Sequence, residues 1–196
     1  NWAFLGCKSL EEITIPDSVK KIGSCAFEYC ESLKEITIPD SVTEIGVGAF
    51  GGCKKLADEN GFVIVKNVLY NYYGNAEKVI IPDYVTKIGD FAFFGCESLK
   101  EITIPDSVTE IGKRAFEGCE NLADENGFVI VRDVLYDYLG NAEKVTIPDS
   151  VTEISSCAFK DCESLKEITI PDSVTEIGEC AFGGCENLAD ENGFVI

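Results

Sequence analysis

The sequence of 196 residues contains no histidine. Histidine is the usual general base and the commonest metal ligand in proteins, so its absence argues against most acid–base enzymes and against histidine metal sites. A glycine-rich phosphate loop and a nucleophile elbow are also missing. We therefore expect no catalytic activity and no cofactor in this chain.

Basic residues and long apolar runs are scarce as well. Lysine and arginine number 16 against 35 aspartates and glutamates, which gives a formal net charge of −19. Such a surface repels phosphate backbones and anionic lipids, so we expect no nucleic-acid partner. No apolar run approaches the roughly 18 residues that a membrane span requires, and we expect no membrane insertion by this chain.

What the sequence does contain is one small unit repeated along its length. Six Ile-Pro steps place prolines at spacings that alternate between 23 and 43 residues: Pro16, Pro39, Pro82, Pro105, Pro148 and Pro171. A fixed period of this size is typical of a solenoid. We expect one elongated domain over residues 1–196, with short units at 7–29, 30–52, 96–118 and 162–184, long units at 53–95 and 119–161, and partial units at 1–6 and 185–196.

The chain opens inside such a unit, because Ala3-Phe4 matches Ala26-Phe27. It also contains no methionine and stops within the start of a further hairpin-like segment. We interpret it as a piece of a longer protein.

Each unit predicts two short strands and a return. Residues 33–38 follow the strand pattern L-x-x-I-x-I of leucine-rich repeats. Pro39 lacks an N–H and should end this strand. Residues 42–45 alternate apolar and polar and predict a second short strand, whereas residues 46–53 predict a tight or helical return.

The motif I-P-D-S-V-T-E-I-G-x-x-A-F-x-x-C, which begins at Ile38, resembles the signature of the BspA-like leucine-rich repeats. The resemblance covers essentially the whole chain. It implies a curved, right-handed leucine-rich-repeat solenoid of the α/β type, with mostly short parallel strands, tight or short helical turns and an inserted, protruding β-hairpin in each long unit. Serines stand where better known leucine-rich repeats carry an asparagine ladder: Ser41, Ser107 and Ser173.

The same resemblance carries the functional expectation. Members of the family occur in surface and secreted proteins of host-associated bacteria and some protozoa. It implies a cell-surface or secreted module that binds a protein or glycan ligand at a host or cell surface, as in adhesion, and that has no catalytic activity. A spacer that presents another domain, and the repeat region of a larger cell-wall or glycan-active enzyme, are the alternatives.

Charged residues on the main sheet alternate in sign from unit to unit. One column reads Lys34, Glu77, Lys100, Glu143, Lys166, and the next reads Glu35, Lys78, Glu101, Lys144, Glu167. In a parallel sheet each charge would face its opposite, at roughly 0.2–1 kcal/mol per pair. We interpret the columns as fixing which unit stacks on which, with a binding face as the alternative. Glu12 against Glu35 is the one exception.

Ten cysteines fall into two groups. Seven share one position in every unit and are expected to be reduced core residues: Cys7, Cys30, Cys53, Cys96, Cys119, Cys162 and Cys185. Cys25, Cys157 and Cys180 share a second position, which we expect to be tolerant and partly exposed. Cys157 and Cys180 would lie on adjacent coils and form a possible disulfide. A Cys25–Cys30 bridge and a zinc site at Cys157, Cys162, Cys180 and Cys185 are less favoured alternatives.

Acidic turns offer a weak case for calcium. Asp58-Glu59-Asn60-Gly61 recurs from Asp124 and from Asp190. These segments lack the alternating ligand spacing of a calcium loop, so we favour a plain turn. The aspartates that follow the six prolines are likewise expected to cap turns.

The insertions in the long units are the best candidates for recognition. Residues 62–65 and 68–72 flank Lys66-Asn67 and predict a β-hairpin, which recurs around Arg132-Asp133. Tyrosine is favoured at interfaces. The candidate partner-binding residues are Tyr70, Tyr72, Tyr73, Tyr136, Tyr138 and Leu139. The alternative is that alternate rings pack the hairpin onto the solenoid.

Overall fold

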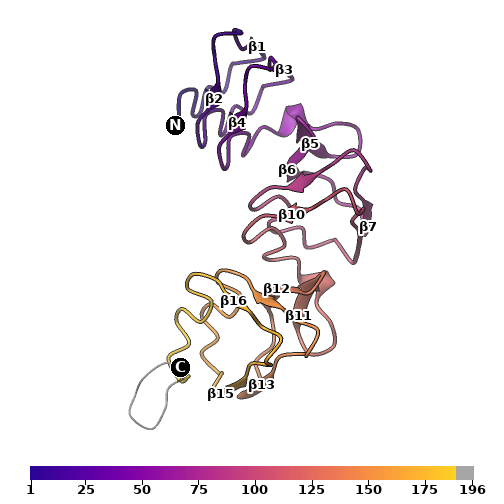
Figure 1. Cartoon of the computed structure of the whole chain (residues 1–196), viewed down its shortest axis with the longest axis vertical. Helices are drawn as coiled ribbons and strands as arrows, with labels where there is room; N and C mark the ends of the chain where they lie inside the picture. Colours follow the sequence, from indigo (N-terminus) through magenta and orange to yellow (C-terminus); the bar gives the residue numbers. More distant parts are fainter. Residues whose placement is uncertain (189–196) are drawn as a thin grey trace. The chain divides into compact units, whose positions relative to one another are not determined.

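The computed structural model describes residues 1–188. Contacts divide the chain into two compact units, the first formed by Asn1–Phe93 and Ile102–Ala115, the second by Phe94–Glu101 and the chain from Phe116 onward. Within each unit, short strands recur at successive turns of a β-solenoid and are joined by tight turns (Figure 1). Among the described residues, no helix has the length and apolar character needed to cross a membrane.

Each coil outside the insertions carries one strand of three residues and one of two. The three-residue strands are β1 (Glu12–Thr14), β3 (Glu35–Thr37), β7 (Lys78–Ile80), β9 (Glu101–Thr103), β13 (Lys144–Thr146) and β15 (Glu167–Thr169). The two-residue strands are β2 (Lys21–Ile22), β4 (Glu44–Ile45), β8 (Lys87–Ile88), β10 (Glu110–Ile111), β14 (Glu153–Ile154) and β16 (Glu176–Ile177). Proline ends the first strand, and its carbonyl accepts the N–H three residues later, as in Val42 N–H to Pro39 O at 3.1 Å.

The predicted hairpins are confirmed. They consist of β5 (Phe62–Val65) with β6 (Val68–Tyr72), and of β11 (Phe128–Val131) with β12 (Val134–Tyr138). Lys66 and Asn67 both have positive φ, 48° and 63°, which suits a two-residue hairpin turn. A single 3-10 turn precedes each hairpin, η1 (Lys54–Leu56) and η2 (Glu120–Leu122).

The expectation that these hairpins protrude is wrong. Strand β6 pairs in parallel with β8, placing Val68 opposite Lys87 and Leu69 opposite Ile88. This is the same relation that joins β2 to β4, where Lys21 lies opposite Glu44. The second strand of the hairpin therefore takes the place of a two-residue strand, and the insertion forms a coil of the solenoid wall.

The hairpins also interrupt the sheets that the charge columns presuppose. The three-residue strands form three separate pairs, β1-β3, β7-β9 and β13-β15, so among the described residues no continuous main sheet exists. Within the pairs the predicted contacts hold, with Lys34–Glu11 at 2.8 Å and Lys144–Glu167 at 2.7 Å. Glu12 does lie opposite Glu35. Opposite charges therefore match neighbouring coils pairwise and do not run as columns.

The core is a stack of rings, one from each coil. In the first unit Phe27 lies 5.0 Å from Phe4 and 5.8 Å from Phe50, with nearly parallel planes. In the second unit Phe159 lies 5.1 Å from Phe182. Because each ring contacts rings in the coils on either side, no single coil can bury its apolar face alone.

The return after the second strand is a tight turn and contains no helix. Two residues with positive φ frame its Ala-Phe pair in every coil outside the insertions. The first of them are Trp2, Cys25, Gly48, Phe91, Arg114, Cys157 and Cys180. The second are Gly6, Tyr29, Gly52, Gly95, Gly118, Asp161 and Gly184. The position shared by Cys25, Cys157 and Cys180 is thus set by backbone conformation, which costs a residue with a side chain roughly 1–2 kcal/mol.

Candidate recognition surface

Tyr72 and Tyr138, which were expected to bind a partner and occupy equivalent positions in the two hairpins, lie in the core. Tyr72 and Tyr138 are each only 6% exposed. Tyr72 donates its backbone N–H to Ala92 O at 2.8 Å, as Phe27 does to Ala49 O, and its ring lies 5.2 Å from Phe93. These tyrosines therefore occupy the phenylalanine position of the inserted coil, which leaves their rings little exposed surface, and their contact with a partner stays a prediction.

The other four candidates divide between packing and exposure. Tyr136 is 3% exposed, so it too belongs to the core, and Tyr70 packs edge-on against Phe50 at 5.1 Å. Burial raises the pKa of Tyr70 to about 12. Leu139 is exposed. The alternative interpretation, in which the rings pack the hairpin onto the solenoid, describes most of this set.

Tyr73 has a structural task of its own. Its hydroxyl accepts the backbone N–H of Gly52 at 2.7 Å, and burial raises the pKa of Tyr73 to about 12. In the second hairpin the N–H of Gly118 is bound instead by Asp137 Oδ2 at 2.9 Å. Where the next coil carries no insertion, the equivalent N–H donates to a backbone carbonyl of that coil, as Tyr29 N–H does to Gly51 O. The hairpin path removes that carbonyl, and a different side chain in each copy replaces it.

The repeated cysteines serve the coil through their thiols. Cys30 Sγ donates to Phe4 O at 3.1 Å, and Cys53 Sγ donates to Phe27 O at 3.0 Å. Burial raises the pKa of Cys53 from its usual 9.0 to about 12. The expectation of seven buried thiols is too broad, because Cys7 is exposed and Cys96 and Cys162 are only half-buried.

Cys157 and Cys180 occupy equivalent positions on adjacent coils, as expected, and both are free thiols in this structure. Cys157 donates its backbone N–H to Glu179 O at 3.1 Å. At the equivalent step in the first unit, a Cβ on Gly48 would lie 3.2 Å from Cys25 Sγ. The spacing suits a disulfide, which stays a prediction.

The acidic segments form turns. Asp58 Oδ1 accepts the backbone N–H groups of Asn60 and Phe62, each at 2.9 Å, and Asp124 does the same in the second copy. Its carboxylate is therefore already used within the loop. The third copy, from Asp190, lies outside the described residues. Within residues 1–188, no three histidine, cysteine or acidic side chains group as a metal site would require.

Sequence reasoning missed a surface on the coil of β7. Ile80 is 73% exposed and Tyr84 is 56% exposed, whereas the second copy of the repeat has Thr146 and Ser150 at these positions. Ile80 borders a hollow of about 320 Å³. Other residues around this hollow include Phe62, Tyr72 and Pro82. We call Ile80, Tyr84 and this hollow the β7 surface.

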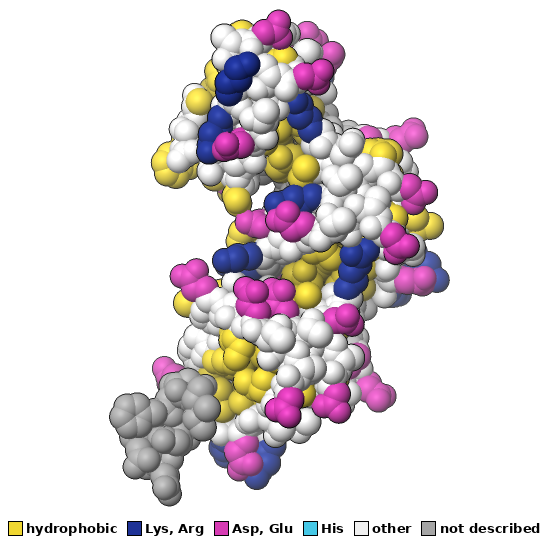
Figure 2. All heavy atoms as spheres, in the orientation of Figure 1, with side chains coloured by type: hydrophobic (Ala, Val, Ile, Leu, Met, Phe, Trp, Pro, Cys, Tyr) yellow, Lys and Arg dark blue, Asp and Glu magenta, His cyan; other side chains and the backbone are white. Residues whose placement is uncertain are grey.

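The β7 surface is not dictated by the fold, because the second copy builds the same coil with small polar residues. Figure 2 shows apolar side chains reaching the surface between acidic and basic ones. A comparison of the two long units position by position would have revealed the difference. The missed signal was thus variation between repeats at exposed sites, which the repeat pattern itself hides.

Comparison with known proteins fits this architecture. The family model for the BspA type leucine rich repeat region matches residues 1–60, 63–126 and 129–192, in six copies. The chain belongs to this family. No curated protein matches it.

Solved leucine-rich repeat proteins resemble the chain in structure. A leucine rich cell surface protein from Faecalibacterium prausnitzii is 30% identical with a TM-score of 0.50, over 94% of this chain and 60% of that protein. A Treponema pallidum (T. pallidum) leucine rich repeat protein is 30% identical with a TM-score of 0.34, over 96% and 70%. One from Bacteroides ovatus is 27% identical with a TM-score of 0.45, over 96% and 68%. This BspA-type chain thus spans less than two thirds of the first relative.

Proposed function

We propose that this BspA-type chain is a surface-exposed or secreted repeat module that binds a protein or glycan, as in adhesion, and has no catalytic activity. The observation that carries the proposal is the β7 surface, where Ile80 and Tyr84 replace Thr146 and Ser150 of the other copy. The family and the name of the Faecalibacterium relative, a cell surface protein, support the location.

The exposed side chains of Ile80 and Tyr84 support the proposal on physical grounds. Exposed apolar side chains weaken solubility, and neither Ile80 nor Tyr84 is needed to build the coil. Tyrosine is enriched among residues that dominate binding energy, and an adjoining hollow can receive a side chain of the partner. The β7 surface therefore supplies contact area and shape for recognition.

Binding to immobilised host matrix proteins and mucin glycans, under reducing conditions and over a range of salt, tests the proposal. We expect saturable binding that weakens by about tenfold or more in the variant Ile80→Thr/Tyr84→Ser, which transplants the residues of the second copy. The core variant Tyr138→Phe, at the equivalent position of the second copy, leaves the β7 surface unchanged and should bind normally.

Absence of binding to every surface tested would contradict the proposal. The two alternatives would then be favoured: a spacer that presents another domain, or the repeat region of a larger cell-wall or glycan-active enzyme.

A further inference from the structure

We infer that a groove beside strand β4 binds an extended peptide strand that carries an acidic side chain. The inference rests on the proposed function and names a second contact site with the chemistry of its partner. The groove lies wholly within the first compact unit, and none of the residues that line it belongs to the β7 surface.

The β4 groove has a volume of about 350 Å³. Its lining includes Thr43 and the segment from Ile45 to Gly48, together with Lys66, Val68 and Tyr70 of the hairpin. No residue of β2 lines it. The groove therefore lies on the side of β4 that faces away from β2.

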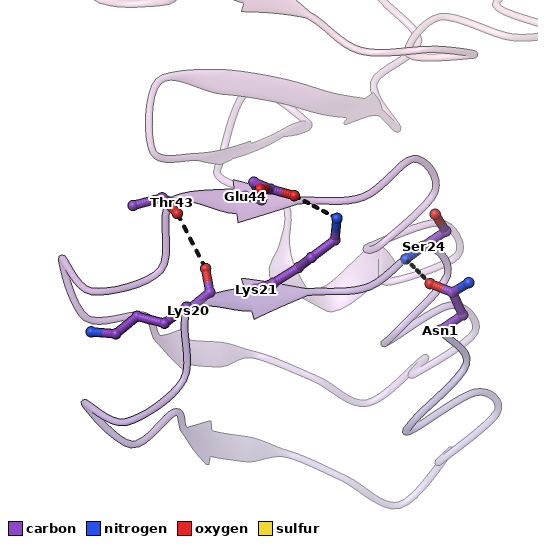
Figure 3. A network of polar contacts seen from close by, with 6 residues as sticks. All are labelled: Asn1, Lys20, Lys21, Ser24, Thr43 and Glu44. Atoms are coloured by element: carbon purple, nitrogen blue, oxygen red, sulfur yellow. Dashed lines mark hydrogen bonds and ion pairs between the residues drawn. The ribbon is translucent and has the colours of Figure 1, made fainter.

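On that side β4 has no partner strand within the described part of the chain. Figure 3 shows β2 and β4 side by side, with Lys21 reaching Glu44 across the paired edge. The N–H of Gly46 donates to Ile22 O at 2.9 Å on this paired edge. Because successive residues of a strand point their backbone groups to opposite edges, the N–H and C=O of Ile45 are directed toward the groove.

An unpaired donor and acceptor at one residue suit a peptide main chain. An extended peptide offers a C=O and an N–H at strand spacing, and it can add to an open edge as a new strand. A glycan or a small apolar ligand does not offer this alternation. The backbone chemistry of Ile45 thus favours an extended peptide as the occupant.

The walls provide a place for an apolar side chain of that peptide. Val47 is 53% exposed and lines the groove with Val68 and the ring of Tyr70. Other coils carry polar residues at the position of Val47: Ser24, Asp90, Lys113, Ser156 and Glu179. No hydrogen bond to the Tyr70 hydroxyl is made within residues 1–188, so this hydroxyl can donate to a ligand.

The charge at the groove indicates an acidic partner. Lys66 Nζ donates to Pro39 O and Val42 O, each at 2.8 Å, so its ammonium is held in place by neutral acceptors, which do not offset its positive charge. Lys87, by contrast, is paired with Glu110. Asp90, which also lines the groove, accepts the N–H of Lys113 at 3.0 Å. A carboxylate of the peptide is therefore stabilised beside Lys66 and repelled by Asp90, which orients the strand.

An array of acetylated hexapeptides, in which threonine and valine alternate and one position varies over all residue types, tests the inference. Solution affinities of the best binders follow from fluorescence anisotropy. We expect aspartate or glutamate to be preferred at the varied position. We also expect N-methylation of two alternate amides, which removes backbone donors and adds bulk at the edge, to weaken binding by about tenfold or more.

Variants of the chain locate the site. Two variants should each lower the affinity for the peptide: Val47→Glu, which introduces the residue type found at Glu179, and Tyr70→Phe. Ile80→Thr on the β7 surface should leave this affinity unchanged. Hydrogen exchange of the Ile45 amide should slow when peptide binds. A melting curve checks that each variant is folded.

The inference fails if no peptide binds, if the N-methylated peptide binds equally well, or if Ile45 exchange is unchanged. Such a result leaves the proposed function standing when matrix or glycan binding still depends on Ile80 and Tyr84. Loss of that dependence, with peptide binding intact, would overturn the β7 surface and leave the β4 groove.

Discussion

Replacing Ser173 by alanine should lower stability, whereas replacing Ser107 by alanine should preserve or raise it, although each serine lies in its own copy of an identical 17-residue sequence. Ser173 Oγ donates to Val151 O at 2.7 Å, and Ser41 makes the equivalent bond to Val19 O at 3.0 Å. The Ser107 hydroxyl oxygen is buried without a hydrogen-bond partner in the described chain. The serines thus form an inter-coil ladder that lacks its bond at Ser107.

The expected magnitudes follow from these contacts. Ser173→Ala removes one hydrogen bond and leaves the Val151 carbonyl unpaired, at a cost of about 1 kcal/mol. Ser107→Ala removes a buried hydroxyl that lacks a partner, which relieves a penalty of about 1–3 kcal/mol less the packing of one oxygen. For a chain of this size, each kcal/mol shifts Tm by about 2–4 °C.

Thermal melts followed by circular dichroism, under reducing conditions, are the assay. Ser173→Ala should melt below the parent chain and Ser107→Ala at or above it. Equal losses of Tm in both variants would refute the reasoning, because they would show that the Ser107 hydroxyl is bonded in solution.

Four further predictions concern charge, backbone and thiols. Glu12→Lys should raise stability by about 0.5 kcal/mol at low salt by facing Glu35 with an opposite charge, and urea titrations that show no gain would contradict this. Cys180→Gly should be about 1 kcal/mol more stable than Cys180→Ala, since φ is 53° there; equal Tm values would refute the strain. Oxidised glutathione should link Cys157 to Cys180 by thiol–disulfide exchange, with a loss of two hydrogens by mass spectrometry; two unlinked thiols would refute it. Stability should fall as pH rises above 9 toward 12, because the unfolded Cys53 thiol ionises there while the folded one stays protonated, and Cys53→Ala should flatten that slope in melts.

Features set by local pattern were predictable from the sequence. The spacing of the prolines predicted the coils, and the bounds of the hairpin strands, 62–65 and 68–72, agree with the structure. Both rest on alternation and turn residues over a few positions, which any coil must satisfy before it packs. The serines at the asparagine positions proved to bond between coils at Ser41 and Ser173.

Features set by stacking between coils were not predictable in this way. The inserted segment was expected to protrude because its sequence reads as a hairpin, but pairing of Leu69 with Ile88 draws β6 into the wall. Tyr72 then falls in line with the phenylalanine stack, which buries it. The positive φ of Cys25 likewise could not be predicted from its residue type, because cysteine rarely adopts this conformation. Only Gly48, at the equivalent position of the next coil, is of a residue type that suggests it.

The candidate site depended on an exception to the repeat. Alignment of units emphasises what recurs, and recurrent residues such as Cys53 and Phe50 build the core. Ile80 and Tyr84 depart from the recurring residues and are exposed, and the second copy builds the equivalent coil with Thr146 and Ser150. Their exposure required the structure, because an apolar residue in a strand is as often buried.

The most direct test of the account is a reciprocal exchange between the two repeat copies, with binding to a matrix protein or mucin glycan as the readout. Ile80→Thr/Tyr84→Ser should weaken saturable binding by about tenfold or more. Adding Thr146→Ile/Ser150→Tyr to that variant should restore part of it, because the same coil then presents the same side chains. Binding that the first exchange leaves unchanged, or that ignores the second, would contradict the claim that this BspA-type module binds through the β7 surface.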